Sequence, residues 1–134
     1  MKQVLTYEER KAQVYSFLGK TVEIVMDRPI GTVHPKHNDI IYPINYGYIE
    51  GVFGGDGEEL DVYLLGVNIP VERYTARIIA IVHRKNDVED KLVAAPECMT
   101  FTAEEITETI RFQEQFYDSK VETEKDKTSG DVRV

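Results

Sequence analysis

The chain has 134 residues, the size of one domain, and its 24 Asp and Glu against 16 Lys and Arg give a formal net charge of -8. With 42% apolar residues, it is neither a disordered chain nor a strongly basic nucleic-acid-binding protein. Because no apolar stretch approaches the roughly 18 residues of a membrane-spanning helix and residues 1–11 are too charged for a signal peptide, we expect one cytoplasmic domain over residues 1–134.

A helix is expected near the N-terminus, within residues 1–19. Thr6 and Glu9 have the spacing of a capping box, in which the threonine hydroxyl and the glutamate carboxylate each accept a hydrogen bond from a backbone N–H. An apolar face follows, and Gly19 is a residue type that commonly ends helices. The pattern therefore predicts a helix over residues 7–18.

Four later segments have the β-branched or alternating pattern of strands and are bounded by Gly, Pro, Asn and Asp. They are residues 21–26, 60–65, 74–83 and 91–94. Together they predict a small antiparallel sheet or barrel. The stretch between the first two, residues 27–59, holds three of the five prolines, and we interpret it as a long loop of the kind that usually carries function.

A second helix is expected after the strands. Thr102 and Glu105 repeat the capping-box spacing, and an apolar stripe at helical intervals continues to about Asp118. From Ser119 onward the chain is polar and charged. We therefore expect residues 119–134 to form a frayed, flexible tail.

The acidic segment 56–61 (DGEELD) places four carboxylates within six residues at the entrance to a predicted strand. Two carboxylates about 5 Å apart repel by roughly 3 kcal/mol at an effective dielectric constant near 20, so solvation or a bound divalent cation must relieve the repulsion. With Cys98 as the only cysteine, a thiolate zinc site is excluded. Oxygen ligands favour magnesium, manganese or calcium, and a solvated turn is the alternative.

Two further segments are candidates for the same site. Residues 83–91 (HRKNDVEDK) form a charged connection that is either a surface turn or, beside the first acidic segment, a place to hold cations and a phosphate anion. Residues 42–48 (YPINYGY) carry phenols that either donate hydrogen bonds to a ligand or pack at a core edge. Upstream of them, Arg28 and His34 are candidates for phosphate contact, with a surface turn as the alternative for the histidine segment.

The segments 42–48, 56–62 (DGEELDV) and 91–96 (KLVAAP) together resemble the signature of the soluble inorganic pyrophosphatases of family I. The resemblance implies an α+β, mainly β fold, namely a five-stranded closed barrel of the OB type with flanking helices. It also implies magnesium-dependent hydrolysis of diphosphate to two phosphates by a metal-activated water, with manganese as a substitute. The expected partner is this small substrate rather than nucleic acid or a membrane, and assembly into homo-oligomers stays open.

The resemblance implies metal-binding roles for several acids. Asp56 and Asp61, the first and last acids of the D-G-[DE]-x-x-D pattern, would hold magnesium, and so would Glu89, two residues before the matching lysine. A gapless match puts Arg84 where the family has an aspartate. Either this metal position is lost, or Asp87 or Asp90 supplies it.

The remaining site residues follow from the same resemblance. Glu58 would position or deprotonate the attacking water, with Tyr46 beside the nucleophile and Asp61 completing the catalytic group. The candidate phosphate-binding residues are Arg28, Lys91, Tyr117, His34 and Arg84. The outer shell of the site would include Glu23 and Tyr42.

Two other functions remain open at this stage. One is a related metal-dependent phosphohydrolase that acts on another small phosphorylated substrate. The other is a non-catalytic OB-type barrel that binds a ligand or a protein, because barrels of this type often serve as binding modules. Phosphate release from diphosphate, compared with release from nucleotides and sugar phosphates, separates the two hydrolases. For the binding barrel, the discriminating observation is whether Asp61→Asn removes all magnesium-stimulated phosphate release.

Overall fold

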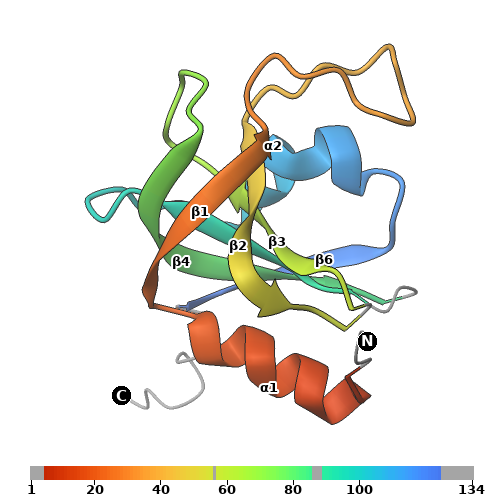
Figure 1. The fold of residues 1–134 in the computed structure, drawn as a ribbon, viewed down its shortest axis with the longest axis vertical. Coiled ribbons are helices and arrows are strands. Elements are labelled where there is room, and N and C mark those ends of the chain that lie inside the picture. The colour runs from red at the N-terminus through yellow and green to blue at the C-terminus, as the bar shows by residue number, and fades with distance from the viewer. Residues whose placement is uncertain (1–4, 56, 86–88, 125–134) are drawn as a thin grey trace.

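The computed structural model describes residues 5–55, 57–85 and 89–124. Asp56 and Asp87, two of the expected metal ligands, therefore lie outside the described residues. Within the described part, the chain forms two helices and six strands (Figure 1). Their buried apolar side chains form two cores. Neither of these helices is long and apolar enough to cross a membrane.

Five of the strands close into a barrel. The helices and strands are α1 (Tyr7–Phe17), β1 (Thr21–Arg28), β2 (Asn45–Phe53), β3 (Glu59–Leu64), β4 (Arg73–Arg84), β5 (Lys91–Ala95), α2 (Ala103–Glu114) and β6 (Ser119–Thr123). The strand order is β1-β2-β3-β5-β4, and pairing of β1 with β4 closes the ring. The fold is thus the expected five-stranded barrel with flanking helices. It is mixed rather than antiparallel, because β3 and β5 run parallel.

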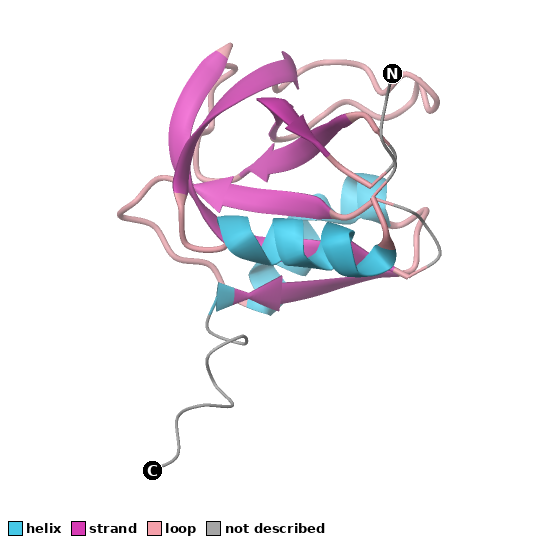
Figure 2. Ribbon diagram, turned by 60° about the horizontal axis from the view of Figure 1, so that its bottom comes forward, coloured by secondary structure: helices cyan, strands magenta, loops and turns pink. Residues whose placement is uncertain are grey.

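Each helix covers a different apolar surface. Inward-facing side chains of all five barrel strands form the inner core, and Val14 of α1 packs against it. In Figure 2, α1 lies across one end of the barrel. Ile106 and Ile110 of α2 pack on the outer surface of β3, β4 and β5, where they bury Val82 and Val93. The spacing of four residues between the two isoleucines puts them on one face of α2.

The helix starts agree with the sequence. Thr6 and Glu9 exchange both hydrogen bonds of a capping box, and Thr102 and Glu105 do the same at the start of α2. Gly19 adopts a φ of 88°, which favours glycine, immediately after the first helix. The second helix ends at Glu114, four residues earlier than expected, and a turn follows it.

The long segment interpreted as a loop contains a full barrel strand. In β2, Gly47 lies against β1 so closely that a Cβ atom would come 2.0 Å from the Val25 carbonyl oxygen. Only glycine allows this approach. The expectation of a loop over residues 27–59 was therefore wrong for Asn45–Phe53, where Gly47 lets two strands meet.

The expectation of a frayed end from Ser119 was also wrong for its first residues. Ser119–Thr123 form β6, which pairs antiparallel with β4 outside the barrel ring, with Ser119 opposite Arg84 and Thr123 opposite Ala80. Val121 packs against the core beneath α2. Residues 125–134 of the expected tail lie outside the described residues.

Candidate active site

Two of the predicted metal-binding carboxylates converge on one lysine. Lys91 begins β5, and its side chain is only 4% exposed. Its Nζ donates a hydrogen bond to Asp61 Oδ2 at 2.7 Å and another to Glu89. Burial acts to lower the pKa of Lys91, but the charges of Asp61 and Glu89 outweigh it and leave the pKa above its ordinary value. Lys91 therefore stays protonated between two carboxylates.

A third carboxylate, Asp27, belongs to the same neighbourhood. It lies near the end of β1, and burial raises its pKa. The charge of Asp61 raises it further, while Arg28 and Lys91 oppose the shift. The sequence analysis did not select Asp27. Its only signal was its position next to Arg28.

Tyr46 packs beside this charged group. It lies on β2 opposite Arg28 and is only 4% exposed. Lys91 Nζ is 5.7 Å and Arg28 Cζ 5.8 Å from its ring centroid. Burial, and then the charge of Asp61, raise the pKa of Tyr46 well above its ordinary value. The phenol therefore remains a neutral hydrogen-bond donor at physiological pH.

Arg28 is held by a chain of buried polar side chains. Its Nη1 donates to the Tyr42 hydroxyl at 2.9 Å, and Tyr42 donates in turn to Gln113 Oε1 on α2. Gln113 Nε2 donates to the Tyr63 hydroxyl at 2.8 Å. The end of α2 thus fixes a phosphate-binding candidate on β1 and a tyrosine on the segment that precedes β2.

Arg84 is fixed by the same end of α2. Its Nη2 and Nε donate to the two Glu114 oxygens at 2.6 and 3.2 Å, and its Nη1 lies 3.5 Å from Glu89 Oε1. The Tyr117 ring stacks on the guanidinium with 3.6 Å between Cζ and the ring centroid. Burial acts to lower the pKa of Arg84, but Glu114 outweighs it and raises the pKa. Arg84 therefore adds a permanent positive charge beside Glu89.

Three further residues that the sequence analysis selected are His34, Glu58 and Glu23. His34 is buried and stacks on Tyr42 with 5.6 Å between ring centroids, and burial lowers its pKa. Glu58 is exposed in the turn that precedes β3. Glu23, expected in the outer shell, is not brought to the cluster, because it pairs with Arg73 at 3.3 Å on the exposed barrel surface.

Gln113 and Glu114 are the main residues that the sequence analysis missed. Both are buried, although glutamine and glutamate are usually exposed. A signal was present, because they follow Ile106 and Ile110 on the stripe that α2 turns toward the barrel. Polar residues on an apolar stripe indicate buried hydrogen-bond partners.

The donor set fits a hard divalent cation only in part. No three His, Cys, Asp or Glu side chains are gathered as a metal site among the described residues. Asp61 and Glu89 nevertheless converge, offer oxygen donors alone, and keep 29% and 22% of their side chains exposed. Such ligands suit magnesium or manganese rather than zinc. Asp27 is the further described carboxylate of this neighbourhood, and the candidate Asp56 lies outside the described residues.

Comparison with protein families gives a match that covers most of the chain. The profile described as inorganic pyrophosphatase matches residues 8–130. No curated protein sequence matches the chain.

Several solved structures have the same fold. The inorganic pyrophosphatase of Ehrlichia chaffeensis superimposes with a TM-score of 0.60 and 16% identity, over 79% of this chain and 87% of that one. The enzyme of Coxiella burnetii gives a TM-score of 0.57 and 16% identity, over 79% and 86%. The enzyme of Helicobacter pylori gives 0.54 and 16%, over 77% and 82%. At these identities the likeness shows the barrel fold.

Proposed function

The chain belongs to the inorganic pyrophosphatase family, a family of diphosphate hydrolases, and from that membership we propose that it hydrolyses diphosphate to two phosphates with a divalent cation, magnesium in the first place. The observation that carries the proposal is the convergence of Asp61 and Glu89 on Lys91. Diphosphate is strongly anionic, so its hydrolysis needs positive charge at both the reacting and the leaving phosphate. This cluster combines oxygen donors for a cation with a buried ammonium.

In this proposal Asp61 and Glu89 hold the cation, with Asp56 and Asp87 as further candidates. A bound divalent cation would neutralise phosphate charge and lower the pKa of a bound water. Glu58 accepts the proton of the attacking water at its carboxylate.

The positive side of the site comes from β1 and β5. Lys91 and Arg28 contact phosphate oxygens, and the neutral Tyr46 phenol between them donates a hydrogen bond. Tyr117, which stacks on Arg84, and His34, which stacks on Tyr42, are further candidate phosphate contacts. Because Arg84 is engaged with Glu114, it acts mainly through its charge and by orienting Glu89.

The test is colorimetric phosphate release from diphosphate, with and without magnesium. We expect release that depends on magnesium and falls by about a hundredfold or more in Asp61→Asn, because the substitution removes a charged metal ligand. The matched control is Asp39→Asn, which changes an exposed aspartate and leaves the rate unchanged. Wild-type rates in Asp61→Asn would contradict the metal assignment.

The same assay with other substrates tests the substrate class. Faster release from a nucleoside triphosphate or a sugar phosphate than from diphosphate would favour a related phosphohydrolase. Absence of release from every substrate, with magnesium or manganese present, would favour a binding module.

A further inference from the structure

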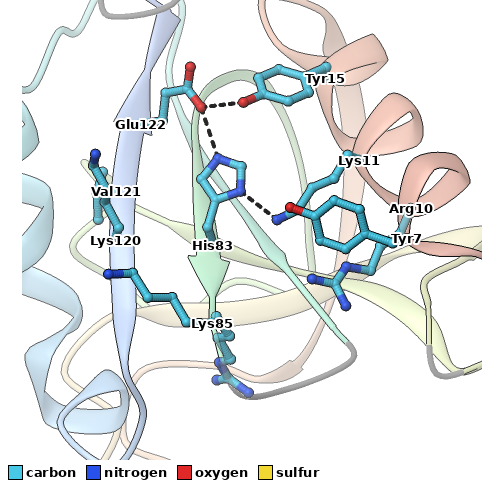
Figure 3. A pocket seen from close by; sticks show the side chains of 10 residues that line it. Tyr7, Arg10, Lys11, Tyr15, His83, Lys85, Lys120, Val121 and Glu122 are labelled. Atoms are coloured by element: carbon cyan, nitrogen blue, oxygen red, sulfur yellow. Dashed lines mark hydrogen bonds and ion pairs between the residues drawn. The ribbon is translucent and has the colours of Figure 1, made fainter.

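A cavity among the described residues lies beside the site proposed for diphosphate. It has a volume of about 840 Å³ and opens between α1, the end of β4 and β6 (Figure 3). Neither Asp61 nor Lys91 lines it, whereas Arg84 of the proposed site does. Its volume is within the range of roughly 300 to 1,000 Å³ that is usual for small-molecule sites.

Basic side chains from three elements gather in this cavity. The pairing of β4 with β6 puts His83 opposite Lys120. Lys85, the first residue after β4, also lines the cavity. Arg10 and Lys11 enter from α1 (Figure 3). Such a concentration of positive charge is unexpected in a chain with a net charge of -8.

The carboxylates near the cavity bind other side chains. Asp90 Oδ2 accepts hydrogen bonds from Arg10 at 3.2 Å and Lys11 at 3.0 Å. Glu122 accepts from the Tyr15 hydroxyl at 2.6 Å and from His83 at 2.9 Å. Lys11 Nζ also lies 2.8 Å from His83 Nδ1. Both acids are therefore already engaged.

Two lysines remain for an anionic ligand. Within the described part of the chain, neither Lys85 nor Lys120 forms an ion pair, and both side chains are exposed at the cavity. Ammonium groups of this kind bind phosphate as compact point charges. The cavity is larger than inorganic phosphate or diphosphate needs, so it has room for a second group on the ligand.

That second group is indicated by a tyrosine. Tyr7, in the first turn of α1, lines the cavity with 65% of its surface exposed. The cationic groups of Arg10 and Lys11 each lie 5.5 Å from its ring centroid. An exposed aromatic ring beside cations is suited to stack on a heterocyclic base. We propose that this cavity binds a nucleotide, with the phosphate at Lys85 and Lys120 and the base at Tyr7.

The cavity also has a direct connection to the proposed active site. Asp90 lies in the chain between Glu89 and Lys91, and its Oδ1 accepts the backbone N–H of Arg84 at 3.2 Å. A ligand that draws Lys11 or Arg10 away from Asp90 therefore changes the support of Glu89 and Lys91. We expect bound nucleotide to change the turnover of diphosphate, a consequence that rests on the proposed function.

Calorimetric titration with adenosine 5′-monophosphate, in the absence of divalent cations, tests binding independently of activity. We expect the double variant Lys85→Gln/Lys120→Gln to bind at least about tenfold more weakly, because it removes both ammonium groups that bind the phosphate. The control Lys20→Gln/Lys36→Gln removes two other exposed lysines and should bind like the wild type. No binding, or equal binding by the double variant, would overturn the proposal.

Three comparisons locate the ligand. Asp61→Asn should keep wild-type affinity for the nucleotide, and loss of affinity there would place binding in the active site and overturn the proposal. Inorganic phosphate and adenosine should each bind more weakly than the nucleotide, and equal affinity for phosphate alone would overturn the role of the base. Tyr7→Ala should weaken binding of the nucleotide but not of phosphate.

The coupling to turnover has its own readout. Addition of the nucleotide should change the rate of phosphate release from diphosphate in the wild type and leave the rate of Lys85→Gln/Lys120→Gln unchanged. An unchanged rate in the wild type would overturn the coupling. If the protein released no phosphate from diphosphate, the titration would still decide whether the cavity binds nucleotide.

Discussion

Asp27 carries a charge that the fold disfavours, since burial and the neighbouring Asp61 raise the pKa of its carboxyl. A carboxyl whose pKa is higher in the folded than in the unfolded chain destabilises the fold when it is ionised. The destabilisation is present above the folded pKa and disappears as the pH falls below the unfolded value. Ionised Asp27 is therefore expected to lower stability at neutral pH.

We predict that Asp27→Asn raises the melting temperature at pH 7 by a few degrees and that the gain disappears near pH 3, because both proteins are then neutral at this position. Thermal unfolding followed by circular dichroism at the two pH values checks this. Asp39→Asn, which changes an exposed aspartate, serves as the control. A gain of the same size at both pH values would show that charge is not its cause.

The same substitution should reduce phosphate release. Residues at functional sites are often retained at a cost in stability, because the chemistry needs a charge that the fold alone would not select. If Asp27 shares the cation with Asp61, a more stable Asp27→Asn variant will be a slower enzyme. Unchanged turnover in Asp27→Asn would show that Asp27 does not bind the cation.

Glu114 holds several elements of the fold together. From the end of α2 it binds Arg84 on β4, the Tyr63 hydroxyl on β3 and the Ser119 hydroxyl at the start of β6. Burial acts to raise the pKa of Glu114, but the hydrogen bonds from Arg84 and its other partners outweigh it, so the pKa lies below its ordinary value. Its contribution to stability is present above the unfolded pKa and is lost as the pH falls through the folded pKa.

We predict that Glu114→Gln lowers the free energy of unfolding by about 3 kcal/mol at pH 7, because it leaves the buried Arg84 without its main partner. The difference should narrow as the pH falls below the ordinary range of a glutamate. Denaturant unfolding at several pH values measures it. Glu108→Gln, which breaks an exposed pair with Arg111 on the same helix, should leave the denaturation midpoint unchanged.

Local patterns in the sequence identified most of the elements. The two capping boxes located both helix starts because they depend on residues three apart, and four of the five barrel strands had a clear pattern. β2 was missed because Gly47 is required by the close approach of β2 to β1. A local sequence pattern contains no information about the distance between two strands. β6 was missed because its charged residues face away from the core that Val121 contacts.

The contact among three candidate residues could be anticipated from the family resemblance of their segments. Asp61, Glu89 and Lys91 were selected on that resemblance, and they lie together in the structure. Asp27 and Glu114 were not selected, because single acids on a strand or helix have no motif and acquire meaning only when other elements pack on them. Asp61, which acts on Asp27, is 34 residues away from it in the chain, and Arg84, which binds Glu114, is 30 residues away from it.

At the scale of the whole molecule, closure of the barrel brings the charged side chains of the candidate site together. The carboxylates near Lys91 come from β1, β3 and the segment before β5, and they meet only when these strands pair. In the unfolded chain the same groups are far apart and solvated. A divalent cation held by this cluster would therefore bind the folded state in preference and stabilise it.

We predict that magnesium raises the melting temperature of the wild type. A ligand at a hundred times its dissociation constant stabilises the folded state by about 2.7 kcal/mol, and about 1 kcal/mol moves the melting temperature of a domain this size by a few degrees. Potassium chloride at equal ionic strength is the control, because salt also screens the repulsion within a chain of net charge -8. Asp61→Asn should retain the response to potassium chloride and lose most of the extra shift with magnesium. An equal shift with the two salts, or a full magnesium shift in Asp61→Asn, would show that magnesium does not bind specifically at the cluster around Lys91. The proposed hydrolysis would then lose its structural support.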